Sequence, residues 1–108
     1  MKSEYTIYMD FQKAKAQADE LKSLAAELRN IADRDLAECL SGISVHWKGD
    51  NAANFIGKGN LVKSRLADAA KNLEQTASTI QKIAVQTYQA EMRAYNIAKR
   101  AMFGGRGR

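Results

Sequence analysis

The feature that most constrains this chain is a short stretch near its middle that separates two long segments with helical periodicity. The stretch is His46-Trp47-Lys48-Gly49-Asp50, and it contains the only tryptophan. Apolar residues recur at helical spacing for about thirty positions before it and for nearly fifty after it. This pattern predicts two amphipathic helices joined by one turn, which is an antiparallel helical hairpin.

The composition agrees with long helices. The 108 residues include no proline, and little of the 45% apolar fraction is aromatic. A β-sandwich or barrel would need many turn signals. A two-helix hairpin has only one internal contact surface, so we expect a partner chain to complete its core. The predicted fold is therefore all-α, a single hairpin domain over residues 1–103 that dimerises into a four-helix bundle, with residues 104–108 as a flexible basic tail.

The first helix is expected at about residues 10–40, with Thr6 or Asp10 as the N-cap and Ser41-Gly42 at its end. Its apolar sector is wider than one partner helix can cover, and this width is the main argument for a second contact. The stripe consists of Phe11, Ala14, Ala18, Leu21, Ala25, Leu28, Ala32 and Leu36, with Leu24 and Ile31 beside it.

The turn is expected at residues 41–50. Trp47 is large enough to close the gap between two diverging helix ends, and it would bury on the order of 200 Å² there. Replacing a fully buried ring at Trp47 by alanine would cost about 3–5 kcal/mol. Gly49 lets the backbone reverse without a Cβ clash, and Asp50 or Asn51 is expected to cap the next helix.

The second helix is expected at about residues 51–102. Gly57 and Gly59 should weaken its start by fraying or bending it. Glu91 falls within the apolar sector, so it either lies beyond the end of the first helix or pairs with a lysine across the helix contact. The stripe consists of Phe55, Val62, Leu66, Ala69, Leu73, Ala77, Ile80, Ile83, Ala84 and Ala94. The predicted helix contact and dimer interface consist of Leu21, Leu24, Leu28, Ile31, Leu66, Leu73, Ile80 and Ile83.

Charge is distributed unevenly along the chain. Residues 1–46 contain 6 Lys/Arg and 8 Asp/Glu, whereas residues 47–108 contain 11 Lys/Arg and 4 Asp/Glu. Lys71, Lys82, Arg93 and Arg100 project from the second helix at nearly the same angle and form a basic stripe. The ordinary explanation is a solvated face, and the alternative is a surface for an acidic partner or a nucleic-acid backbone. Without interleaved aromatic residues or a groove-reading motif, nucleic-acid binding is the less favoured function.

Enzymatic and metal-binding functions find no support in the sequence. Cys39 and His46 are the only residues of their types, and a hairpin offers no pocket in which they could act together. The ligands of a metal site are missing, and no cofactor is expected. No apolar run approaches the length of a membrane span, and the first residues lack the features of a signal peptide.

With its turn at Trp47-Lys48-Gly49, the chain resembles the WXG100 (ESAT-6-like) family in length, motif position, flanking helices and lack of proline. Trp47 and Gly49 match the family motif. The resemblance implies synthesis in the cytoplasm and export without a Sec signal peptide by a type VII (ESX/Yuk-type) secretion system. It also implies a homodimer or a heterodimer, with another hairpin or with the helical N-terminal domain of a larger secreted toxin, and recognition by the secretion ATPase.

The sequence departs from the family at the C-terminal Tyr-x-x-x-Asp/Glu export signal. Tyr88 is followed four residues later by Met92, Tyr95 is followed by Lys99, and Glu91 lies one position too early. Either a partner supplies the signal, or the chain resembles the divergent small helical partners of LXG-type toxins. The basic C-terminal end favours the partner role. The candidate targeting region consists of Tyr88, Glu91, Tyr95, Lys99 and Arg100.

Overall fold

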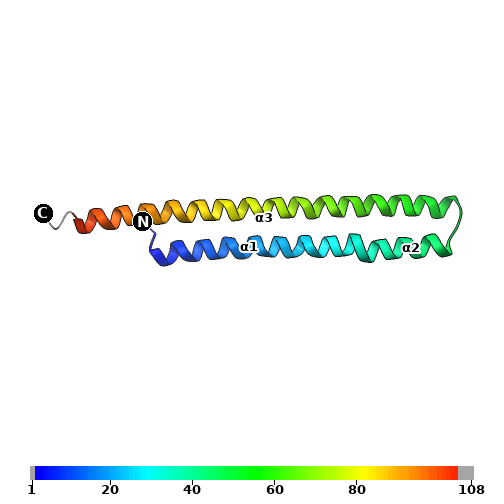
Figure 1. Cartoon of the computed structure of the whole chain (residues 1–108), viewed down its shortest axis with the longest axis horizontal. Coiled ribbons are helices and arrows are strands. Elements are labelled where there is room, and N and C mark those ends of the chain that lie inside the picture. Colours follow the sequence, from blue (N-terminus) through cyan, green and yellow to red (C-terminus); the bar gives the residue numbers. More distant parts are fainter. Residues whose placement is uncertain (1, 105–108) are drawn as a thin grey trace. The chain divides into compact units, whose positions relative to one another are not determined.

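The computed structural model describes residues 2–104, which form helices on either side of one short turn (Figure 1). Helix α1 spans Glu4–Asn30, the π-helical segment η1 spans Ile31–Leu36, α2 spans Ala37–His46 and α3 spans Asp50–Gly104. The described residues contain no strand. The predicted all-helical hairpin is therefore confirmed. The expected tail begins at Gly104, the last residue of α3, and its remaining residues 105–108 lie outside the described part.

The chain divides into two compact units. The terminal unit combines Met1–Asp19 with Ala77–Arg108, and the turn unit is Glu20–Thr76. In each unit, a segment from the first half of the sequence packs against a segment of α3.

Both units have cores made mainly of alanine. The larger apolar residues of the expected stripes remain partly exposed, and Ala70 is buried where Ala69 was expected. Small side chains let two helices approach closely, but each buries little apolar area. The buried residues are Ile7, Ala18, Ala77 and Ala84 in the terminal unit, and Ala25, Ala32, Leu40, Ala52 and Ala70 in the turn unit.

Helix α1 starts at Glu4, well before the expected start near residue 10. Ser3 caps it, since the Ser3 Oγ accepts a hydrogen bond of 3.1 Å from the backbone N–H of Thr6. The prediction that Thr6 or Asp10 is the N-cap was therefore wrong. A serine followed by an acidic residue in the first turn was the signal for the earlier start.

The expected helix end at Ser41-Gly42 was also wrong, because α2 continues to His46. A glycine inside a helix costs only about 1 kcal/mol, and continuing the helix keeps its backbone groups paired. The backbone N–H of Trp47 donates to the Ile43 carbonyl oxygen at 2.8 Å. The Lys48 ammonium donates to the Ser44 carbonyl oxygen at 3.1 Å. These bonds pair two carbonyl oxygens of the last turn, and the connection between α2 and α3 is shorter than the expected residues 41–50.

The turn depends on two residues. Trp47 is extended, with φ −126° and ψ 123°, and Gly49 has a φ of 107°, the left-handed region that favours glycine. The ring centroids of Trp47 and Phe55 are 6.2 Å apart, and Trp47 remains 47% exposed. The ring is therefore not fully buried, and the cost of about 3–5 kcal/mol, which holds only for a fully buried ring, does not apply to Trp47→Ala.

The glycines near the start of α3 have different surroundings. α3 is continuous through both, so the expected fraying does not occur there. A Cβ at Gly57 would meet nothing within 4 Å, whereas a Cβ at Gly59 would overlap the side chain of Leu40. Gly59 therefore makes room for the one leucine buried in the turn unit.

We expect Gly57→Ala to stabilise the protein by about 1 kcal/mol, because alanine is the better helix former. Gly59→Ala gains the same propensity but forces Leu40 to move. We expect it to be about 1–3 kcal/mol less stable than Gly57→Ala. Urea unfolding of the two variants at equal concentration measures this difference. Equal midpoints would show that Leu40 does not need the space at Gly59.

Candidate functional site

The candidate site is an apolar face along α3. Counting from Phe55 to Ala101 with alternating spacings of four and three residues gives a series of positions that contains no charged residue. This is the heptad pattern of a helix that packs against other helices. We call these positions the heptad face: in the turn unit they are Phe55, Gly59, Val62, Leu66, Ala69, Leu73 and Thr76, and in the terminal unit Ile80, Ile83, Thr87, Ala90, Ala94, Ile97 and Ala101.

Much of the heptad face is accessible to solvent. Val62 is 49% exposed in the turn unit, and Ile83 and Ile97 are 55% and 56% exposed in the terminal unit. Leu66, Leu73 and Ile80 are half-buried, as expected for positions that border the alanine cores. Isolated exposed apolar residues are normal, but a regular series of them along one helix indicates a binding surface.

The first half of the turn unit shows the same arrangement. Leu24 and Ile31 are seven residues apart and largely exposed, whereas Leu21 and Leu28 are half-buried. The predicted interface leucines and isoleucines thus border the alanine cores and are not enclosed by them. The alternating spacing can be counted directly from the sequence, but the predicted stripe of the second helix did not include six of these positions: Gly59, Thr76, Thr87, Ala90, Ile97 and Ala101.

One flank of the heptad face is basic. The residues seven apart from Lys58 to Arg100 include Arg65 and Arg93 but no acidic residue. All four cationic side chains are exposed, as are Lys71 and Lys82 of the predicted basic stripe. This flank can attract carboxylates of a partner during association.

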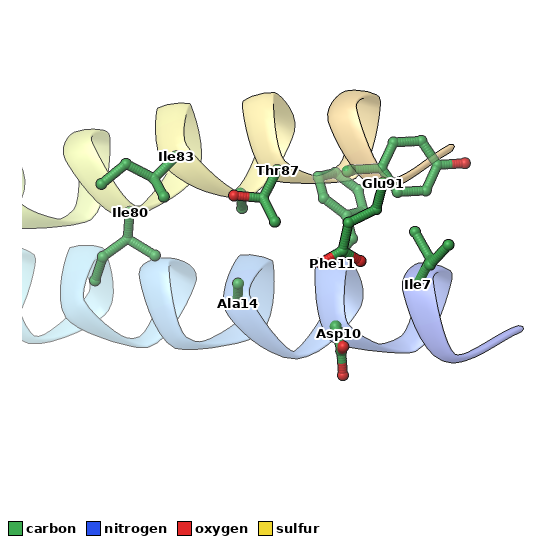
Figure 2. Close-up of a pocket in the computed structure, with 10 residues that line it drawn as sticks. Ile7, Asp10, Phe11, Ala14, Ile80, Ile83, Thr87 and Glu91 are labelled. Atoms are coloured by element: carbon green, nitrogen blue, oxygen red, sulfur yellow. The ribbon is translucent and has the colours of Figure 1, made fainter. Parts of the chain in front are cut away.

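The terminal unit contains a groove of about 240 Å³ beside its alanine core (Figure 2). Phe11 and Tyr88 pack with ring centroids 5.1 Å apart. Since Ala14 and Ala84 are small, space remains beside the rings. A second groove of about 290 Å³ also borders Phe11 and Ala84. The first groove is lined by Ile7, Asp10, Phe11, Ala14, Ile80, Ile83, Ala84, Thr87, Tyr88 and Glu91.

Two carboxylates of this groove share one ammonium group. The Lys2 Nζ lies 2.9 Å from the Asp10 Oδ2 and 3.1 Å from the Glu91 Oε1. Hydrogen bonds to Asp10 and then to Glu91 raise the pKa of Lys2 above its ordinary value. Of the two alternatives for Glu91, the structure shows pairing with a lysine. The contacts of Lys2 with Asp10 and Glu91 were not predictable from the sequence, because only the fold brings Lys2 and Asp10 close to Glu91.

The candidate targeting residues differ in their surroundings. Tyr88 packs against Phe11 and Glu91 binds Lys2, so both contribute to the terminal unit. Tyr95 is half-buried, with the Lys99 ammonium 6.0 Å from its ring centroid. Lys99 and Arg100 are exposed near the end of α3. The structure therefore leaves these two basic residues the most accessible members of the region.

An ion pair in the turn unit connects α1 with α3. The Arg29 guanidinium donates to a carboxylate oxygen of Glu74. This hydrogen bond holds the pKa of Glu74 below its ordinary value and raises the pKa of Arg29. A carboxyl whose pKa is lower in the folded state stabilises the fold above its unfolded pKa, and this contribution is lost as the pH falls through the folded pKa.

We therefore expect Glu74→Gln to flatten the dependence of stability on pH below about pH 4.5, which is the ordinary pKa of a glutamate carboxyl. Thermal unfolding of wild type and variant between neutral and acidic pH measures the effect. Arg29→Gln should flatten the dependence of stability on pH over the same range. Adding Glu74→Gln to the Arg29 variant should change this dependence little more. Independent effects of the two substitutions would mean that the pair does not act as a unit.

Other chemistry finds little basis in the described residues. Over residues 2–104, no three His, Cys, Asp or Glu side chains are grouped so that they could hold a metal ion. Cys39 is exposed and not in a disulfide. Any stretch of membrane-spanning length in the described helices is too polar to cross a bilayer, as the sequence predicted.

No known family model, curated protein or solved structure matches the chain. The resemblance to the WXG100 family stays a prediction, and it depends on the central Trp47-Lys48-Gly49 turn between two helices.

Proposed function

We propose that this protein is a small helical partner protein of a type VII secretion system. It acts by binding another helical chain through the heptad face, either a second copy of itself or the helical N-terminal domain of a larger toxin. The resulting complex is a four-helix bundle, which is exported as a dimer or delivers the toxin to the secretion ATPase. The observation that carries the proposal is the partly exposed heptad face on a hairpin with alanine cores.

The energetics favour a partner at this face. Burying apolar surface contributes about 25 cal/mol per Å², so covering isoleucines and valines adds more than the buried alanines supply. The positions of Leu24 and Ile31 extend the apolar surface to the first half of the chain. The basic flank from Lys58 to Arg100 favours a partner with carboxylates beside its own apolar stripe. The Trp-x-Gly turn supports the secretion role by resemblance.

The physical part of the proposal is tested by size-exclusion chromatography with light scattering. We expect a dimer at micromolar concentration, or a heterodimer on coexpression with a helical toxin domain encoded beside the gene. Ile83→Glu places a charge on the heptad face and should dissociate the complex. Ser78→Glu, on an exposed position of α3 outside that face, should not. A stable monomer that also fails to bind the toxin domain would contradict the proposal.

The biological part requires export. We expect the protein, or its toxin partner, in the culture medium of wild-type cells, and its loss from the medium when the secretion ATPase gene is deleted. A protein that leaves the cell equally well without the ATPase does not use this route. Affinity for DNA or RNA that falls steeply with salt would instead favour the nucleic-acid alternative.

A further inference from the structure

The groove of the terminal unit has a chemical character that the heptad face as a whole lacks. Its walls are apolar, with Phe11 and Ala14 from α1 and Ile80 and Ile83 from α3 (Figure 2). Asp10 and Glu91 also line it, and they bind the same ammonium group. A ligand that fits both features needs an apolar group and a cation close together.

Lys2 shows which charge these carboxylates select. It precedes α1, and its side chain is 51% exposed. Ion pairs between exposed groups are weak because water competes with them. A cation from another molecule can therefore replace Lys2 without breaking the helices of the terminal unit. An anion at the same place would meet two carboxylates once Lys2 left.

We propose that this groove binds a helix of a partner protein that carries a lysine or arginine one helical turn from a bulky aliphatic side chain. The aliphatic side chain enters the groove between Phe11 and Ile83. The cation takes the place of Lys2 between Asp10 and Glu91. Residues four apart on a helix lie about 5–6 Å from each other, so one helix can present both groups together. The inference rests on the proposed partner-binding role but not on the secretion route.

The test uses the full chain and two helical alanine-based peptides. One carries leucine and lysine four residues apart, and the control carries glutamate in place of the lysine. We expect the lysine peptide to shift the backbone NMR signals of Ala14, Ile83 and Thr87 on titration, and the glutamate peptide to bind more weakly. Lys2→Ala should strengthen binding of the lysine peptide, because it removes the competing cation.

The double variant Asp10→Asn/Glu91→Gln should weaken binding of the lysine peptide about threefold to tenfold. Asp19→Asn, which changes an exposed carboxylate of α1 outside the groove, should leave the affinity unchanged. Equal binding of the two peptides, or weaker binding by Lys2→Ala, would overturn the inference. A chain that dimerises but does not bind the lysine peptide disproves the inference alone. A monomeric chain that is not exported and delivers no toxin, but binds the peptide, disproves the proposed function alone.

Discussion

Replacing Ala25 by leucine is expected to lower the free energy of unfolding by about 1–3 kcal/mol, because the added methyl groups have no space in the core of the turn unit. Ala25 is only 1% exposed. Alanine and leucine differ little in helix propensity, so the loss would report packing and not helix formation. Urea unfolding followed by circular dichroism measures it. Wild type and variants must be compared at one protein concentration, since dimer formation would contribute to stability.

The control is Ala26→Leu, one residue later on the exposed side of α1. We expect it to change stability by no more than about 0.5 kcal/mol. A larger loss of stability for Ala25→Leu than for Ala26→Leu would support the conclusion that alanines hold the helices close together. If the Ala25 variant is as stable as the Ala26 variant, the two helices of the turn unit are further apart than the structure describes.

The turn and the helices on either side of it were predictable from the sequence because their signals are local. The central glycine and the long periodic segments around it predicted one reversal, and Gly49 has the positive φ that such a turn uses. The limits of the first helix were less predictable. Ser3 rather than Thr6 caps its start, and Gly42 does not end it. Such boundaries depend on small differences in free energy that neighbouring contacts decide.

The composition of the core could not be inferred from the width of the apolar stripe alone. Leucines and alanines alternate on the same face of the first helix, and hydrophobicity favours burying the leucines. The structure buries Ala25 and Ala32 and leaves Leu24 and Ile31 exposed. The seven-residue spacing of the alanines was the signal that could have indicated this. The groove residues Lys2 and Asp10 had no comparable signal, because their contacts with Glu91 join residues far apart in sequence.

The π-helical segment η1 follows from one irregular spacing. Ala18, Ala25 and Ala32 are buried at steps of seven, and the next buried residue is Leu40, eight positions later. In a regular helix with seven-residue periodicity, Cys39 would take that place, but Cys39 is exposed. A π-helical turn contains an extra residue and so returns Leu40 to the face that meets Gly59.

Deleting Arg34 from η1 is therefore expected to leave stability within about 1 kcal/mol of wild type. The shortened segment can form a regular α-helix, and Leu40 then follows Ala32 by the seven-residue step that the other buried positions use. Deleting Lys22 from the regular part of α1 should instead cost several kcal/mol. It rotates the preceding residues by about 100° relative to those that follow and moves their apolar positions off the core.

Both deletions remove one exposed charged residue, so their comparison isolates the phase of the helix. Thermal unfolding by circular dichroism gives the two stabilities, and the backbone NMR signals of Ala32 and Gly59 report whether the core of the turn unit is retained. We expect cooperative unfolding near the wild-type midpoint for the Arg34 deletion and a large loss for the Lys22 deletion. If the Arg34 deletion were as damaging as the Lys22 deletion, the extra residue in η1 would not set the phase of the buried face.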